Sequence, residues 1–346
     1  MISQEPDKQQ TQPPPSVPKF SNVPRKHRYF VGRDGDLDTL RRRLSPSAQT
    51  EESKPRSCLI HGMGGMGKTQ LSRAYSDDSS YDFHFWVQAE SVAKLTESFQ
   101  AIANALGLSP SQAGSDLVET VKSLLEEQDN SWLLIFDNVE DGSFNEAVGA
   151  MPIKARKASA IVMTSQLEEL KHHTQSVIHL ASLETQEGVD LLLRCLQRDP
   201  ATVSPRDHEL LVEISTKLGG LPLALAHTGG YMSKSKEELS EFNDFFNDRW
   251  EHIVYATKQQ RVHQYNSQAL DVVWDFALER LEANQRKLIN ILAYLNADDI
   301  EKEWLVEERR LSCGWVDNGL SAKSQYVSRR PDFRIYLANV AVAFMI

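Results

Sequence analysis

The stretch that decides the fold is CLIHGMGGMGKTQLSRAY, residues 58 to 75. An apolar run leads into a glycine-rich turn, and the turn leads into a segment with helical spacing. The turn, Gly62 to Thr69, fits the pattern G-x-x-x-x-G-K-[ST]. Its place between a predicted strand and a predicted helix separates a phosphate-binding loop from a chance match. We therefore predict a phosphate loop here, with an ordinary glycine-rich turn as the alternative.

Each residue type in this loop has a physical task. Glycines let the backbone curl so that successive N–H groups face one anion, and the following helix directs its positive end to the same place. Lys68 is expected to neutralise phosphate oxygens, and the Thr69 hydroxyl is expected to bind Mg²⁺. The predicted nucleotide-binding residues in and beside the loop are Gly62, Gly64, Gly65, Met66, Gly67, Lys68, Thr69 and Gln70.

A second signal is the segment WLLIFDNVED, residues 132 to 141, an apolar strand that ends in an acid. The carboxylate of Asp137 is expected at the C-terminal edge of the sheet, where ligands bind in open α/β folds. There it could hold Mg²⁺ directly or through water. A turn residue at the end of a strand is the alternative, but the phosphate loop makes a metal-binding role for Asp137 the better prediction.

The order of elements predicts an α/β fold, a parallel P-loop sheet covered by helices on both faces. After Leu180 the strand signals stop. A helix capped by Thr185 is predicted, followed by helices that begin at Asp207 and Pro222. Two more periodic segments follow at 268–282 and 284–295, so an all-α domain should follow the sheet. The expected strands are 58–62, 83–88, 131–137, 160–165 and 177–180, and the helices between them are 68–76, 91–106, 115–128 and 143–149.

Composition narrows the function classes. The net charge of -10 provides no electrostatic basis for binding nucleic acid or an anionic membrane. The three cysteines have no paired spacing, which is typical of the reducing cytoplasm. No apolar run is long enough to cross a membrane. Residues 1–28 begin with a Pro- and Gln-rich segment, and this composition predicts a disordered tail.

Several motifs in a fixed order resemble one family. YFVGRD at 29–34, the phosphate loop, LLIFDN at 133–138, ASAIVMTSQ at 158–166 and GGLPLALA at 219–226 follow one another. In this order they are similar to the NB-ARC module of the STAND ATPases, which include plant disease-resistance proteins and apoptosome scaffolds. The chain looks most like the fungal relatives of these proteins, and the resemblance covers about residues 29 to 306.

The resemblance implies a domain plan and further site residues. A nucleotide-binding domain at 29–180, a helical domain at 181–255 and a partial winged-helix region at 256–346 are expected. ADP or ATP with Mg²⁺ would lie between the first two domains, and Pro222 would pack on the base. Residues from the opening motif would lie against the adenine, and these are Val31, Gly32 and Arg33.

Three departures from the family pattern change the expectation. Asn138 stands where a second acid is common, so hydrolysis should be slow or absent unless Glu140 or Asp141 substitutes. The segment ASAIVMTSQ occupies the place of the family's sensor strand, which commonly ends in an arginine that reaches the γ-phosphate. Gln166 stands at that end and carries no charge, which weakens discrimination between ATP and ADP by this contact. The His-Asp motif of the winged helix is missing, and residues 307–346 suggest a truncated or altered product.

The predicted function is therefore a cytoplasmic adenine-nucleotide switch module, in which nucleotide biases the orientation of two domains. Self-association or signalling-protein partners are expected, with no membrane partner. One alternative is an active P-loop NTPase or phosphotransferase. Another is a winged-helix DNA-binding regulator, although residues 267–346 hold ten Lys and Arg against twelve Asp and Glu, so nucleic acid is not the expected partner.

Overall fold

A computed structural model describes residues 19–45, 54–108, 116–235, 239–244 and 247. The chain divides into two compact units, with the division between Ala181 and Ser182. Each unit is described by itself below. Among the described residues, no helix combines the length and the apolar character needed to cross a membrane.

The first unit is built on one sheet of six strands, and every recorded pair of neighbours is parallel. The strand order is β1-β3-β4-β5-β2-β6, so β5 lies between the strand before the phosphate loop and the strand that carries Asp137. This confirms the predicted α/β fold. The strands are β1 (Phe20–Ser21), β2 (Arg56–His61), β3 (Phe83–Gln88), β4 (Trp132–Val139), β5 (Ala160–Ser165) and β6 (Ser176–His179).

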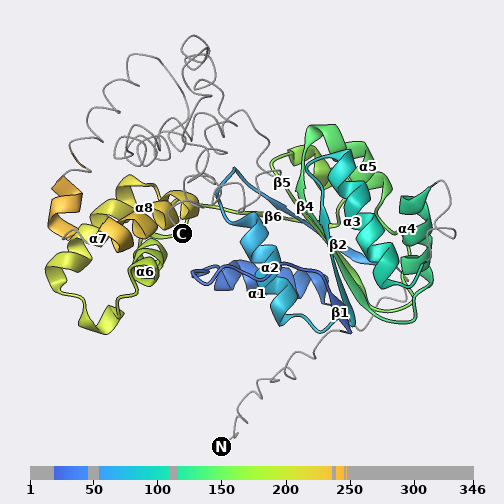
Figure 1. Ribbon diagram of the computed structural model, residues 1–346, viewed down its shortest axis with the longest axis horizontal. Coiled ribbons are helices and arrows are strands. Elements are labelled where there is room, and N and C mark those ends of the chain that lie inside the picture. The colour runs from blue at the N-terminus through green and yellow to red at the C-terminus, as the bar shows by residue number, and fades with distance from the viewer. Residues whose placement is uncertain (1–18, 46–53, 109–115, 236–238, 245–246, 248–346) are drawn as a thin grey trace, which may run out of the picture. The chain divides into compact units, whose positions relative to one another are not determined.

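Helices cover both faces of this sheet (Figure 1). On one face lie α1 (Asp34–Leu44) and α2 (Lys68–Asp78), and on the other lie α3 (Val92–Ala105), α4 (Leu117–Glu127) and α5 (Phe144–Gly149). Two of the helices have side-chain caps, since the Ser91 and Asp116 side chains accept from backbone N–H groups in the first turns of α3 and α4. Short 3₁₀ turns, η1 (Asp141–Ser143) and η2 (Glu168–His172), follow β4 and β5.

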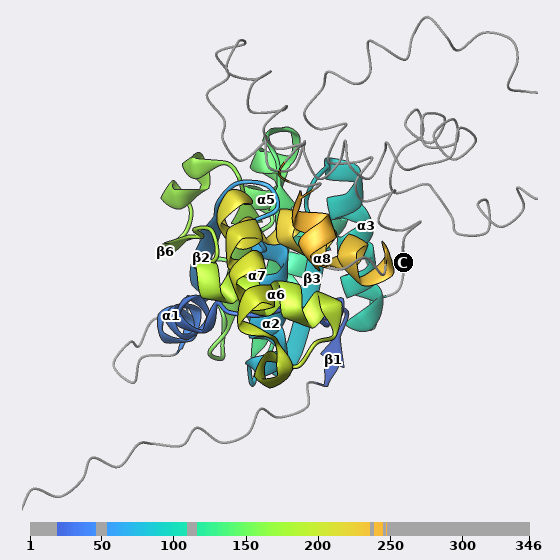
Figure 2. The same ribbon diagram turned by 90° about the vertical axis from the view of Figure 1, so that its left-hand side faces the viewer.

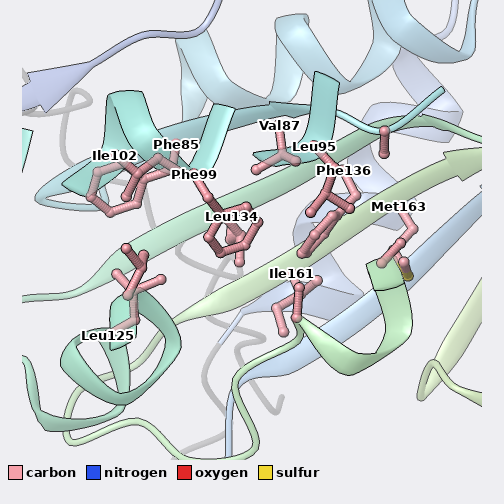
Figure 3. Close-up of a cluster of buried hydrophobic side chains, with 14 of the residues drawn as sticks. Phe85, Val87, Leu95, Phe99, Ile102, Leu125, Leu134, Phe136, Ile161 and Met163 are labelled. Carbon is pink, nitrogen blue, oxygen red and sulfur yellow. The ribbon is translucent and has the colours of Figure 1, made fainter. Parts of the chain in front are cut away.

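The main hydrophobic core lies between the sheet and the face formed by α3 and α4 (Figure 3). Phe136 of β4 and Phe99 of α3 are fully buried, and their ring centroids are 6.3 Å apart. The Trp132 indole Nε1–H donates to the Leu125 carbonyl at 2.9 Å, which satisfies its polar atom inside the core. Because helices cover both sheet faces, the central strands are apolar throughout rather than alternating.

Part of the expected disordered tail, residues 1–28, lies within the described residues. From Lys19 onward the chain is described, and Phe20–Ser21 adds a parallel edge strand to β3. The Asn22 side chain then continues this contact, accepting from Trp86 N–H at 2.7 Å and donating to Trp86 C=O at 3.2 Å. Composition cannot reveal this order, because the partners are unpaired backbone groups on the edge of a distant strand.

The second unit packs three helices together, α6 (Thr185–Leu196), α7 (Pro205–Lys217) and α8 (Pro222–Ser235) (Figure 2). Gly188 allows α6 to approach α7 closely, because a Cβ at this position would stand 2.1 Å from Ser215 Oγ of α7. A short 3₁₀ turn, η3 (Pro200–Thr202), precedes α7. The predicted start of α7 was two residues late, because Ser204 caps it by accepting from Asp207 N–H. The predicted helices at 268–282 and 284–295 and the winged-helix region at 256–346 lie outside the described residues.

Candidate phosphate-binding site

The predicted phosphate loop joins β2 to α2, as its sequence pattern requires. Gly65 and Gly67 have φ angles of 79° and 90°, a left-handed conformation that glycine adopts without strain. These turns point successive N–H groups in one direction, which produces a concave anion-binding backbone. The backbone N–H groups from Gly65 to Gln70 have no hydrogen-bond acceptor among the described residues. Open donors at a helix N-terminus are suited to an anion.

Lys68 lies over the beginning of the loop. Its Nζ donates to the carbonyl oxygens of Gly62 at 2.8 Å and Met63 at 2.9 Å. The residue is only 8% exposed. Burial lowers the pKa of the Lys68 ammonium to about 8, and the Asp137 carboxylate opposes this shift. A desolvated cation beside open N–H donors is expected to gain more from a phosphate than from two carbonyl oxygens.

Asp137 and Thr69 meet, as the sequence predicted. Asp137 Oδ1 accepts from Thr69 Oγ1 at 2.9 Å and from Thr164 Oγ1 at 2.7 Å. Burial raises the pKa of Asp137, while the two hydroxyl groups and the cations of Arg73 and Lys68 lower it. No hydrogen bond to Asp137 Oδ2 is recorded among the described residues, so this oxygen remains available.

The opening motif also reaches the loop, through Arg33. This residue is buried, and its Nη2 donates to the Met66 carbonyl at 3.1 Å while Nη1 pairs with Asp36 at 3.3 Å. Gly32 and Arg33 have φ angles of 62° and 67°, and the bend they form precedes α1. Val31 is buried beside them, but no contact with the loop is recorded for it.

Gln70 binds the segment before this motif, since its Oε1 accepts from His27 N–H at 2.8 Å. The predicted residues of the opening motif and of the loop are thus brought to one end of α2. Whether each of them touches a base remains a prediction.

The position after Asp137 has a distinct conformation. Asn138 has a φ of 60°, at an irregularity in the register between β4 and β5. Its N–H donates to Thr164 Oγ1 at 2.8 Å, and its side-chain Nδ2 donates to Glu140 Oε1 at 2.8 Å. The amide therefore binds Glu140, one of the two acids that the sequence had offered as a substitute base. The other, Asp141, lies in η1.

Sequence reasoning missed two residues. The Thr164 hydroxyl bridges β5 to Asp137, a role that needs the observed strand order. Arg73 lies one turn after Thr69 on α2 and stacks over the Trp86 ring at 5.1 Å, with its buried Nε unpaired among the described residues. The spacing of four residues from Thr69 could have revealed Arg73 as a second cation on the same helix face.

Pro222 lies in the second unit, where it is the first residue of α8. Its contact with a nucleotide base remains a prediction from the resemblance. A cavity of about 550 Å³ lies nearby in the same unit, beside the Gly219–Gly220 turn and the start of α6. Its lining has one charged residue, Glu184, whose side chain caps α6. The lining of this cavity has no cation, whereas the phosphate loop has the buried Lys68 ammonium, so the loop is the stronger candidate site.

The residues of the loop fit a phosphate-bearing ligand with a divalent metal. The open N–H groups and the Lys68 ammonium suit phosphate oxygens. Hard oxygen donors such as Asp137 Oδ2 and Thr69 Oγ1 suit Mg²⁺, which usually binds one or two protein oxygens together with phosphate.

Comparison with known proteins agrees with this geometry. Residues 34–200 match the family model described as the NB-ARC domain. The chain contains an NB-ARC domain. The matched range runs from the start of α1 to η3 and includes the phosphate loop and the Asp137 strand. An NB-ARC domain is a nucleotide-binding module, as the sequence motifs had predicted.

Curated relatives are plant proteins. A late blight resistance protein homolog of Solanum demissum is 25% identical over 248 residues, which is 68% of this chain and 19% of the relative. A disease resistance protein of Arabidopsis thaliana is 23% identical over 296 residues, 79% of this chain and 33% of the relative. The chain thus spans about a fifth of the length of the first curated relatives.

Two solved archaeal structures are also similar. One is a Pyrococcus horikoshii STAND protein with a tetratricopeptide repeat sensor, 12% identical, with 95% of this chain and 57% of that chain covered at a TM-score of 0.40. The other is a Walker-type ATPase of Pyrococcus abyssi, 13% identical, with 92% and 99% covered at a TM-score of 0.44. The fold assignment rests on the sheet order described above, and not on these overlaps.

Proposed function

We propose that the first unit binds an adenine nucleotide, ADP or ATP, with Mg²⁺, and acts as the switch module of a signalling protein. The observation that carries this proposal is the run of open N–H donors from Gly65 to Gln70 next to the buried Lys68 ammonium. A desolvated cation that has only two carbonyl partners is costly in the free protein, and open backbone donors can exchange water for an anion. A diphosphate group offers both of them acceptors at once.

Each residue has a separate task in this proposal. Lys68 exchanges its two carbonyl partners for phosphate oxygens, while Asp137 and Thr69 are the residues that would hold Mg²⁺. When bound, this ion neutralises phosphate charge. Burial raises the pKa of Asp137, and Thr164 and Arg73 oppose that rise, while the Thr164 hydroxyl also orients the carboxylate. Val31, Gly32, Arg33 and Gln70 are the proposed neighbours of the base, and Pro222 is a further proposed contact.

A signalling role in innate immunity is supported by the disease-resistance relatives. Because the chain spans only part of their length, partners and self-association also belong to the proposal. We place the protein in the cytoplasm, where the free thiols of Cys58 and Cys195, both buried, would persist.

The direct test is to denature purified protein, identify any released nucleotide and compare wild type with Lys68→Ala. Near-stoichiometric ADP or ATP is expected from wild type and none from the variant. After bound nucleotide has been removed, the melting temperature should rise on adding Mg·ADP, because saturation at 100 times Kd adds about 2.7 kcal/mol of stability. Adding GDP at the same concentration tests whether the site prefers adenine to guanine. If no nucleoside phosphate shifts the melting temperature of wild-type protein, the proposal is wrong.

Hydrolysis is proposed to be slow or absent, because an amide at Asn138 cannot take a proton from water. One observation favours the alternative of an active NTPase: Asn138 Nδ2 donates to the Glu140 carboxylate, which brings a base close to the end of β4. Steady-state turnover above about 1 s⁻¹ would support that alternative. Its loss in Glu140→Gln, with nucleotide affinity kept, would identify the base.

A further inference from the structure

The phosphate loop has two halves with different hydrogen bonding. In the first half, Gly62 N–H donates to the Ser165 carbonyl at 3.4 Å, and Gly64 N–H donates to Gln166 Oε1 at 3.1 Å. In the second half, from Gly65 to Gln70, the N–H groups have no acceptor among the described residues. The boundary between closed and open donors therefore falls just after Gly64.

A side-chain amide closes Gly64, and its orientation is determined. Because Gly64 N–H is a donor, the Gln166 atom that faces it must be the oxygen and not the nitrogen. The loop thus holds an acceptor with partial negative charge at Gly64. This is the kind of atom that a phosphate would otherwise place there.

The backbone of Gln166 is held from the opposite side. Its carbonyl lies 3.3 Å from His61 Nε2, and His61 Nδ1 lies 3.3 Å from His179 Nδ1 on the neighbouring strand β6. A carbonyl only accepts, so His61 donates from Nε2–H, and the Nδ1 atoms of His61 and His179 pair as donor and acceptor. Gln166 is therefore anchored to β2 through its backbone while its side chain reaches the loop.

The position of Lys68 shows which end of the loop Gln166 occupies. Loop N–H groups hold the first phosphates of a nucleotide, and the loop lysine reaches those at the far end. Lys68 Nζ lies on the carbonyls of Gly62 and Met63, in the closed half next to Gly64. A third phosphate would extend toward this half, where the Gln166 oxygen already accepts from Gly64 N–H.

We propose that Gln166 is a specificity-determining residue that limits the open cradle to two phosphate groups and so favours a nucleoside diphosphate over the triphosphate. The sequence alone predicted weaker discrimination between ATP and ADP at this position, because it does not show the hydrogen bond from Gly64 N–H to the Gln166 side chain. This rests on the proposed nucleotide binding and deepens it. A diphosphate fills the open donors and leaves Gln166 in place. A triphosphate must displace the Gln166 oxygen or bring like charge against it.

The test is the ratio of two dissociation constants, for the hydrolysis-resistant β,γ-imido analogue of ATP and for ADP, measured by calorimetry with Mg²⁺. Wild type should bind ADP more tightly. Gln166→Ala removes the competing acceptor and should reduce this ratio about 2- to 10-fold, which corresponds to the net value of one neutral hydrogen bond. The change should come from tighter binding of the triphosphate, with the dissociation constant for ADP unchanged. Gln166→Glu keeps the acceptor and adds charge, so the ratio should rise about tenfold or more.

Glu169→Ala is the matched control, an exposed residue three positions further along the chain, and it should leave the ratio unchanged. A ratio that stays within twofold of wild type in both Gln166 variants overturns the inference. Weaker triphosphate binding in Gln166→Ala also overturns it, because the amide would then be donating to the third phosphate.

Two further measurements separate this inference from the proposed function. In the free protein, exchange of the Gly64 amide proton should be slowed in wild type and faster in Gln166→Ala, which tests the contact without any ligand. Pyrophosphate and tripolyphosphate should show the same ratio changes as the nucleotides if the base plays no part. If wild type binds neither nucleotide nor pyrophosphate, the proposed function and this inference both fail.

Discussion

Phe136 and Asp137 are neighbours on β4, but their side chains lie on opposite faces of one sheet. Phe136 points into the apolar core under α3, where it is fully buried against Phe99. Asp137 points to the α2 face, where it accepts hydrogen bonds from Thr69 and Thr164. The alternation of a strand thus divides two tasks between adjacent residues.

Both faces bury apolar side chains, such as Phe136 on the α3 face and Leu71 on the α2 face, but the polar site residues lie on the α2 face. On the α3 face, burial of apolar surface stabilises the fold. On the α2 face, burial places an ammonium, a carboxyl and a histidine in surroundings that shift their pKa values, which costs stability in the free protein. Substitutions on the first face should therefore change the free energy of unfolding. Substitutions of the buried polar and charged residues on the second should change binding and pH dependence.

The largest effect is expected from Phe136→Ala. Truncating a fully buried phenylalanine costs about 3–5 kcal/mol of unfolding free energy, through lost burial and the cavity left behind. Urea denaturation measures it. The matched control is Ile153→Ala, since Ile153 is 62% exposed and should change stability by less than about 0.5 kcal/mol. Equal effects of the two substitutions would contradict the assignment of the core.

The next effect concerns His84, which is buried on the α2 face. Its ring nitrogens lie 3.0 Å from Ser76 Oγ and 3.3 Å from Ser79 Oγ, and burial lowers its pKa from 6.5 to about 4. Between these two pH values the unfolded chain binds more protons, so stability is lost as the pH falls from 6.5 toward 4. The loss from this group should approach about 3 kcal/mol.

Denaturation midpoints of wild type and His84→Gln between pH 7 and pH 4.5 measure this effect. The stability of the variant should depend less on pH in the acid range. The contribution of His227 should still be present, since burial also lowers its pKa to about 4. Parallel pH curves for the two proteins would mean that His84 is not the group responsible.

A smaller free-energy change, with a large change in binding, is expected for Lys68→Met. Loss of its charge-assisted contacts should weaken nucleotide binding about 100-fold, whereas the unfolding midpoint of the free protein should stay the same or rise. Lys171→Met is the control, since Lys171 pairs with Glu168 at the surface and should leave affinity unchanged. A strong drop in stability together with affinity would assign Lys68 to the core instead.

The smallest effect is the pH dependence of the same contact. The pKa of Lys68 is about 8 in the free protein, and bound phosphate keeps the ammonium charged, so binding takes up a proton above that pH. The dissociation constant should therefore increase about tenfold from pH 7 to pH 9. Lys68→Met should lack this rise. A flat profile in wild type would show that the ligand does not rely on the Lys68 charge.

Much of the site could be predicted because its signals are local. The phosphate loop is one contiguous pattern, so Lys68 and Thr69 could be assigned from eight residues and the elements on either side. Asp137 could be assigned because an acid at the end of a buried parallel strand lies at the C-terminal edge of the sheet, where ligands bind. The loop glycines adopt left-handed angles that only their residue type allows without strain, as at Gly65 and Gly67.

The rest depends on contacts between segments far apart in the chain. Gln166 and Gly64 are 102 positions apart, and their hydrogen bond exists because β5 lies next to β2. The Asn22 side chain, just after the edge strand β1, bonds the backbone of Trp86, 64 positions away, and composition does not reveal that strand. Such pairs leave no local pattern, since each partner alone is an ordinary polar residue.

The amino-acid sequence by itself determined that a phosphate loop follows a buried strand and that an acid stands at the end of another. Both follow from short-range steric and polar constraints on the backbone. The tertiary structure alone decided which donors of that loop stay open and which one Gln166 closes. The reason is that hydrogen-bond satisfaction is set by the neighbours that strand order brings together, and strand order is a property of the whole sheet.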